Sequence, residues 1–335
     1  MSEQPSSLIL RPSSPDSGTR LDAYLTKNIE GWSRARLSRL IESGDVLVNG
    51  SPAKSSYKVR ENDEIDVELT EYAPTRFEPE NIPLDIVFED EHLAVINKPA
   101  GKVVHPGAGV SSGTLANAVA YHFLEPLTSS AADSQRGEPP ASAGGSSHRI
   151  GIVHRLDKDT SGLIVVAKSE EISDALSEQF REREVFKSYV ALVHGALREN
   201  SGKIETPIAR EKFNRVKMAV SAHGRHALSL WRVRKRFEKF TLLDVEIKTG
   251  RTHQIRVHLA SINHPVVGDE TYNAGRDKTV ADIEIRKAVH DLGRFFLHAE
   301  RLAFTHPKTD QHLEFRQELP KELKQFLDLL MMKAK

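Results

Sequence analysis

The chain has 335 residues, of which 39% are hydrophobic and 28% charged, and it contains no cysteine. This length is enough for a sizeable core and predicts one large domain with a smaller companion. The lack of cysteine excludes disulfides, thiolate zinc sites and cysteine nucleophiles. No apolar run approaches the roughly 18 residues that span a bilayer, which excludes a membrane role.

The charges cancel overall but are segregated along the chain. Residues 20 to 60 carry eight Lys or Arg against four Asp or Glu, and residues 203 to 256 carry fourteen against five. Residues 61 to 99 carry twelve acids against two bases. Basic stretches bind phosphate, and an acidic stretch limits indiscriminate binding. The pattern favours a nucleic-acid partner, although a solvated surface explains any single run equally well.

The first 18 residues are rich in Ser and Pro and contain no apolar core. This composition predicts a disordered lead and no signal peptide, so we expect a cytoplasmic protein.

Residues 19 to 70 predict a compact unit of two short helices followed by strands. Leu21, Tyr24 and Leu25 share one helical face, and the second helix, which Ser33 could cap, has apolar residues at helical spacing. Asn49-Gly50 favours a tight hairpin. The second helix also carries three arginines on its other faces: Arg34, Arg36 and Arg39.

The order TRLDAYL and then SRARLSRLIESGDVLVNG resembles the small RNA-binding module named after ribosomal protein S-four. Arginines on a short helix beside a hairpin can grip the phosphates of folded RNA by shape. The resemblance therefore implies that Arg34, Arg36 and Arg39 bind RNA. A small α+β domain that binds protein is the alternative.

Residues 71 to 83 are acidic, contain Pro and predict a linker to a second domain over residues 84 to 335. Apolar runs in that domain predict strands at residues 85–88, 93–96, 163–167, 189–193 and 241–247. Helical spacing appears between Ile172 and Phe180 and again after Pro320. These elements predict an α+β fold. Residues 127 to 148 are rich in Ser, Ala, Gly and Pro and predict a disordered insertion.

The segment HRLDKDTSGL, from His154 to Leu163, crowds polar residues into a loop between two strand-like runs. A carboxylate flanked by cations can act as a covalent nucleophile or move protons. From the residues alone, a solvated turn explains such a loop more often than an active site.

The same segment resembles the catalytic signature of the RluA-type pseudouridine synthases. Other segments match that family in type and order: VINKPAGKVVHPGAG, KSYVALVHG, GRTHQIRVHL and HPVVGDETY. Together with the N-terminal module, they resemble the branch that acts on large-subunit ribosomal RNA. The resemblance implies a mixed, mostly antiparallel sheet with flanking helices and an RNA-binding cleft.

The resemblance also implies roles for single residues. Asp157 matches the essential aspartate, Arg256 the arginine that pairs with it, and Tyr189 the tyrosine that packs against the target base. Arg155 matches an arginine that enters the space left by the flipped nucleotide, and phosphate contact is its alternative. His154 and Arg251 are expected to contact RNA.

The implied reaction detaches uracil from ribose, rotates it and rejoins it through carbon. It needs no cofactor and no metal. The expected partner is ribosomal large-subunit RNA or a pre-ribosomal particle, without a membrane, and the expected state is a monomer. The sequence leaves open whether Asp157 attacks the sugar or removes a ribose proton to give a glycal.

Two other functions are set against this interpretation. A metal-dependent hydrolase is suggested by fifteen histidines, including His253 and His258. Their spacing does not match HExxH, and a strand over this segment would place them on opposite faces. A non-catalytic RNA-binding ribosome-assembly factor is the second. It is disfavoured because Asp157, Tyr189 and Arg256 are all present.

Overall fold

The computed structural model describes residues 7–29, 32, 34–42, 44–69, 78–106, 110, 112–124, 151–211 and 217–333, without the side chains of residues 7, 35, 36, 39 and 124. The predicted insertion at 127–148 lies outside the described residues. So do most of the predicted linker and the side chains of Arg36 and Arg39.

The N-terminal domain packs two helices against a four-stranded sheet of order β1-β4-β2-β3. Its elements are β1 Ser7–Leu10, a 3-10 helix Ser14–Asp16, α1 Leu21–Asn28, α2 Arg34–Glu42, β2 Val46–Val48, β3 Ser51–Pro52 and β4 Ile65–Glu68. The predicted helices and hairpin are therefore confirmed. The prediction of a disordered lead is wrong for residues 7 to 18. Strand β1 pairs antiparallel with β4, and Leu8 and Leu10 pack against the domain core.

The second domain is built on a ten-stranded sheet whose central path runs β10-β13-β14-β9-β15-β8-β6-β5. Among the described strands, only β8 and β15 pair in parallel. This confirms the predicted mixed, mostly antiparallel sheet. The strands are β5 Ile86–Glu89, β6 Leu93–Lys98, β7 Gly151–Ile152, β8 Ser161–Ala167, β9 Phe186–His194, β10 Ser201–Glu205, β13 Leu228–Arg236, β14 Phe240–Ile247, β15 Leu297–Thr305 and β16 His312–Arg316. A separate hairpin joins β11 Ile208–Arg210 to β12 Met218–Val220.

Helices cover both faces of the central strands. All seven residues of β8 are buried, because Ile164 and Val166 share one core cluster with α3 while Leu163 and Val165 share another with α4. Such a strand is a continuous apolar run rather than an alternating one. The helices are α3 Leu115–Leu124, α4 Glu170–Arg181, α5 Gln254–Ser261, a 3-10 helix Arg276–Thr279, α6 Ile283–Asp291 and α7 Lys321–Lys333.

The segment that carries His253, Arg256 and His258 is not a strand. It forms the start of helix α5, so the expectation of alternating faces for the two histidines is wrong. His258 is buried and its ring nitrogens contact the Ser229 hydroxyl and the Thr206 carbonyl, which gives it a structural place.

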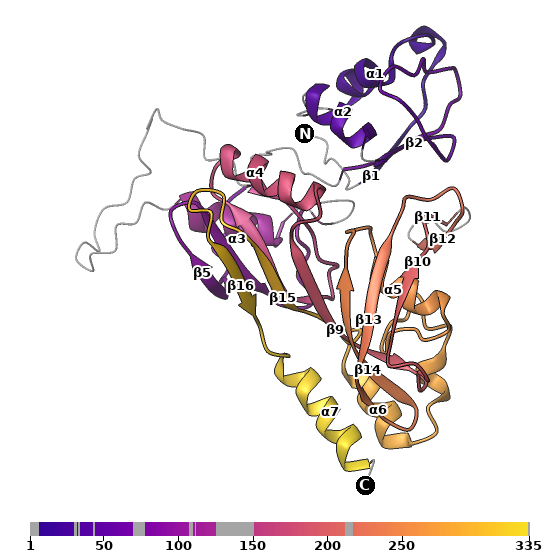
Figure 1. The fold of residues 1–335 in the computed structure, drawn as a ribbon, viewed down its shortest axis with the longest axis vertical. Coiled ribbons are helices and arrows are strands. Elements are labelled where there is room, and N and C mark those ends of the chain that lie inside the picture. Colours follow the sequence, from indigo (N-terminus) through magenta and orange to yellow (C-terminus); the bar gives the residue numbers. More distant parts are fainter. Residues whose placement is uncertain are drawn as a thin grey trace, which may run out of the picture.

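The two domains meet through buried polar contacts. The guanidinium of Arg225, in the turn after β12, donates to the carboxylate of Glu68 at 3.0 Å and to the carbonyl oxygens of Gly44 and Asp45. Arg251 pairs with the Asp45 carboxylate. Figure 1 shows the N-terminal domain as a separate indigo lobe at one end of the long axis, with α7 at the other end. Among the described residues, no helix is long and apolar enough to cross a membrane.

Candidate active site

Asp157 lies in a turn between β7 and β8 that is held from both sides. The Thr160 amide donates to the Asp157 carbonyl at 3.0 Å, which closes the turn. Behind it, the ammonium of Lys98 donates to the carbonyl of Lys158 at 2.9 Å and to those of Pro99 and Lys102. The Lys98 side chain has no exposed surface. A buried group with three satisfied bonds fixes the turn that presents Asp157.

Burial lowers the pKa of Lys98 to about 7, and the nearby charge of Arg294 adds to the effect. The hydrogen bonding acts in the opposite direction, because three carbonyl acceptors match the three N–H bonds of an ammonium group. We therefore assign the charged form to Lys98 at neutral pH.

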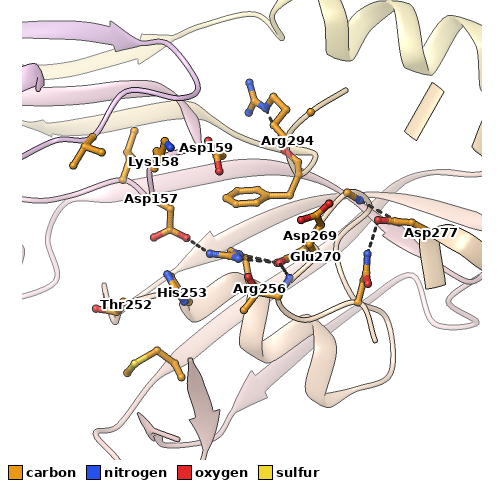
Figure 2. Close-up of a pocket in the computed structure, with 18 of the residues that line it drawn as sticks. Asp157, Lys158, Asp159, Thr252, His253, Arg256, Asp269, Glu270, Asp277 and Arg294 are labelled. Atoms are coloured by element: carbon orange, nitrogen blue, oxygen red, sulfur yellow. Dashed lines mark hydrogen bonds and ion pairs between the residues drawn. The ribbon is translucent and has the colours of Figure 1, made fainter. Parts of the chain in front are cut away.

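Arg256 joins two carboxylates across the site. One terminal nitrogen donates to Asp157 at 3.1 Å, while Nε and the other terminal nitrogen donate to the two oxygens of Asp269 at 2.7 and 2.8 Å. Figure 2 shows this arrangement, with Arg256 between Asp157 and Asp269. The guanidinium carbon also lies 4.3 Å from the ring centre of Phe295 and 5.0 Å from that of Tyr272. A bidentate ion pair and two aromatic faces leave Arg256 little freedom.

The electrostatics keep Asp157 ionised. Burial raises its pKa, but the charges of His253, Arg256 and Arg155 outweigh burial, and the pKa lies below its ordinary value. His253 contributes only when it is protonated, and burial lowers the pKa of His253 itself. At neutral pH, the guanidinium groups of Arg256 and Arg155 therefore account for most of the lowering of the Asp157 pKa. The result is an ionised carboxylate that remains partly exposed.

Tyr189 reaches the same place from the centre of the sheet. It lies on β9, is 6% exposed, and lines a small cavity together with Asp157 and Arg256. Burial raises its pKa, and the neighbouring charge of Asp157 raises it further, so the phenol stays neutral. The structure thus brings together the three residues that the sequence singled out for chemistry.

A larger cavity of about 1680 Å³ opens over Asp157 and Arg256. Its walls mix both signs of charge, with several basic side chains among them. A concave site of this size with convergent charged groups suits a polar, anionic ligand. The basic lining residues are Arg155, Lys158, Arg210, Lys278, Arg286 and Arg294.

Two of the predicted RNA contacts, His154 and Arg34, lie outside both cavities, whereas the third, Arg251, lines the smaller one. The Nε2 atom of His154 accepts a hydrogen bond from the Val165 amide at 3.0 Å, and its ring stacks on Phe180, 4.6 Å between centres. Arg251 is engaged by Asp45 of the N-terminal domain. The partly exposed Arg34, on α2, forms an ion pair with Asp22. His154 is thus part of the fold behind the loop, and we leave it out of the proposed RNA contacts.

Asp269, His253 and Lys98 were not predicted from the sequence to take part in the pseudouridine synthase chemistry. Asp269 lies thirteen residues after Arg256, beyond the end of α5, and no local pattern predicts that its carboxylate turns back to the guanidinium. The available signal was the segment HPVVGDETY, which matches the family but had no assigned chemistry.

These features define an α+β enzyme with a small accessory domain and a half-buried carboxylate held by arginine under an open, charged cavity. A model described as RNA pseudouridylate synthase matches residues 92–261, and a model of the S4 domain matches residues 19–65. The chain belongs to the RNA pseudouridylate synthase family. It is a pseudouridine synthase, and its substrate is RNA.

Similar proteins agree with this assignment. An uncharacterized RNA pseudouridine synthase of Aquifex aeolicus is 41% identical over 308 residues, which cover 91% of this chain and 92% of that protein. Ribosomal large subunit pseudouridine synthase D of Xanthomonas campestris pv. campestris is 39% identical over 94% of this chain and 91% of its own length. The solved structure of human RNA pseudouridylate synthase domain containing 1 has the same fold, with a TM-score of 0.53, 23% identity, and coverage of 76% of this chain and 96% of that one.

Proposed function

We propose that this protein converts specific uridines of large-subunit ribosomal RNA to pseudouridine, with Asp157 as the catalytic residue. The observation that supports it most directly is the half-buried Asp157 carboxylate, kept ionised by an arginine that Asp269 fixes in turn. The substrate class is supported by a relative that is 39% identical and is named for the large ribosomal subunit. Ribosomal RNA or a pre-ribosomal particle is the proposed partner, and a monomer is the proposed state.

In the proposed reaction the target uridine leaves its stack and enters the cavity. Extrusion costs roughly a few kcal/mol, which the basic lining offsets through contacts with phosphates. Arg155, at the edge of the cavity, fills the space that the base leaves. Tyr189 packs its neutral ring against the base beside Asp157.

Asp157 then acts on the ribose, either as a nucleophile at the anomeric carbon or as a base that yields a glycal. Both routes need the ionised carboxylate that Arg256 maintains. Uracil is released and rotates, and its carbon 5 forms the new bond to the anomeric carbon of the ribose. The hydrogen on carbon 5 then leaves as a proton, while N1 of the base takes up a proton. The reaction has no net redox change and adds no group.

The test measures tritium release from large-subunit rRNA transcripts labelled at carbon 5 of uracil. We expect Asp157→Ala to lower the rate by at least about 10⁴-fold, the scale seen when a nucleophile or its base is removed, while RNA affinity is unchanged. Asp174→Asn, on the exposed face of α4, is the matched control and should release tritium at the wild-type rate.

A loss confined to RNA binding would refute the catalytic role of Asp157. No release by the wild type from any rRNA or tRNA would instead favour a non-catalytic ribosome-assembly factor.

A further inference from the structure

We propose that His253 is a neutral imidazole with its proton held on Nε2, and that this N–H group donates to a carbonyl oxygen of the uracil in the cavity. The second half rests on the proposed function. The first half concerns the protein alone and can be measured without any RNA.

The backbone of His253 is in an uncommon conformation. Its φ of 55° and ψ of 19° place it in the left-handed region, directly before the first residue of α5. A residue other than glycine costs about 1 to 2 kcal/mol there, and such strain gathers at functional sites. The strained residue lines the cavity, and Figure 2 shows its ring beside Asp157. The conformation thus directs an imidazole to the reacting carboxylate.

A chain of hydrogen bonds selects the tautomer of that imidazole. The Met218 amide donates to the hydroxyl oxygen of Tyr272 at 2.8 Å, and the same hydroxyl lies 2.8 Å from Nδ1 of His253. Because the amide already donates to the phenol oxygen, we assign the O–H of Tyr272 as the donor to Nδ1. Because a neutral imidazole has one donor and one acceptor nitrogen, an accepting Nδ1 places the proton on Nε2.

Burial keeps the His253 ring neutral, and the neighbouring charges act in both directions. Burial lowers the pKa of His253; Asp157 and Asp269 favour the charged form, whereas Arg256 and Arg155 oppose it, and the pKa lies below its ordinary value. The hydrogen bond from Tyr272 also favours the neutral ring, because a protonated imidazole would have no acceptor for the O–H of Tyr272.

A neutral donor at this position suits the proposed chemistry. When the bond between uracil and ribose breaks, its electron pair goes to the base, and the negative charge is shared with the carbonyl oxygens. An N–H group already aimed at such an oxygen stabilises this charge without reorganisation. A charged imidazolium would instead pair with Asp157 and compete with the sugar for the carboxylate. We therefore assign His253 as the hydrogen-bond donor to the uracil and Tyr272 as the positioning residue that fixes the tautomer of His253.

The tautomer can be read from nitrogen chemical shifts of protein labelled with ¹⁵N-histidine. His253→Asn identifies the signals of His253 by their loss, and asparagine tolerates the left-handed conformation, so the backbone is preserved. We expect a protonated Nε2 and an unprotonated Nδ1 at pH 7.5. Tyr272→Phe keeps the aromatic ring over Arg256 but removes the O–H, and should give a mixture of tautomers. A wild-type ring that is protonated at Nδ1 would overturn the first half of the proposal.

Kinetics test the second half. We expect His253→Asn to lower kcat by about 10²-fold, the scale of one lost donor to a developing oxyanion, with little change in KM. Tyr272→Phe should lose activity mainly at acidic pH, because the pKa of His253 rises when the acceptor role of Nδ1 is no longer enforced. An unchanged kcat for His253→Asn, or an equal loss at every pH for Tyr272→Phe, would refute the assigned roles. If the wild type shows the expected tautomer but modifies no RNA, the proposed function fails and the tautomer assignment stands.

Discussion

At the scale of single residues, the site depends on the carboxylate of Asp269, which acts on Asp157 only through Arg256. Asp269 is 1% exposed and holds two of the three nitrogens of the Arg256 guanidinium, so the third is directed at Asp157. Removing the charge of Asp269 would let the guanidinium rotate. The functional unit is therefore the three charged groups of Asp157, Arg256 and Asp269 rather than the pair of Asp157 and Arg256.

Asp269→Asn should lower kcat about 10- to 100-fold, which corresponds to about 1.4 to 2.7 kcal/mol of transition-state stabilisation. The loss should be larger at low pH. Arg256 lowers the pKa of Asp157, so a misdirected guanidinium lets that pKa rise, and the reactive carboxylate is protonated sooner as the pH falls. The measurement is kcat from pH 5 to pH 8. Asp269→Glu should recover part of the rate, and a loss that is independent of pH would argue against this positioning role.

His154 gives a second prediction, for stability. Burial lowers its pKa to about 3, with a further contribution from Lys187. The ring is therefore neutral in the folded chain at pH 5 but protonated in the unfolded chain, whose pKa is about 6.5. Because the unfolded state binds more protons, stability falls between pH 7 and pH 5, by about 1 to 2 kcal/mol for this residue.

The measurement is urea unfolding of wild type and His154→Gln at both pH values. Glutamine offers an oxygen to the Val165 amide but does not titrate, so the variant should lose less stability than the wild type on acidification. RNA affinity should be the same for both proteins. Weaker RNA binding by His154→Gln would restore the sequence-based expectation that His154 contacts RNA.

At the scale of elements, apolar patterning predicted β5, β6, β8, β9 and β14 of the large sheet but missed other strands, among them β10, β13, β15 and β16. The runs that became β6, β8, β9 and β14 are buried over all or most of their length, so their hydrophobic pattern carries the information. The same reasoning failed at α5, because Gln254 to Ser261 alternates apolar and polar residues as a short strand does. Its helical state is decided by packing, with Ile255 and Leu259 in the main core. The contact between Asp269 and Arg256 depends on that helix and was not predictable without it, whereas the pairing of Arg256 with Asp157 was already implied by the family resemblance.

The single parallel pairing among the described strands depends on one glycine. Gly162 has a φ of +114°, and a Cβ there would lie 2.2 Å from the Ala299 carbonyl oxygen of β15. Only a residue without a side chain lets β8 approach β15 this closely directly after the turn of Asp157. The glycine of the DKDTSGL segment, Gly162, therefore has a structural reason. From the sequence alone, this segment was predicted only to be a polar turn.

At the scale of the whole molecule, the N-terminal domain is docked against the loop that leads into the active site. Glu68 and Asp45, each 4% exposed, contact Arg225, Arg251 and Thr252 of the second domain. Arg251 and Thr252 directly precede His253. A buried ion pair leaves an uncompensated charge when one partner is removed, at a cost of about 3 to 5 kcal/mol. The domain is thus positioned to affect both RNA affinity and the geometry of the site.

Deleting the first seventy residues should therefore raise KM for RNA more than it lowers kcat, but kcat should also fall, because Arg225 and Arg251 lose their partners. The matched variant is the double substitution Asp45→Asn with Glu68→Gln in the full chain, which removes the charges that hold the domains together and keeps every RNA-facing residue. If docking supports catalysis, the double variant should reproduce the fall in kcat with little of the rise in KM. If the domain serves only as a tether for RNA, the deletion alone should show a defect, and that defect should be confined to KM.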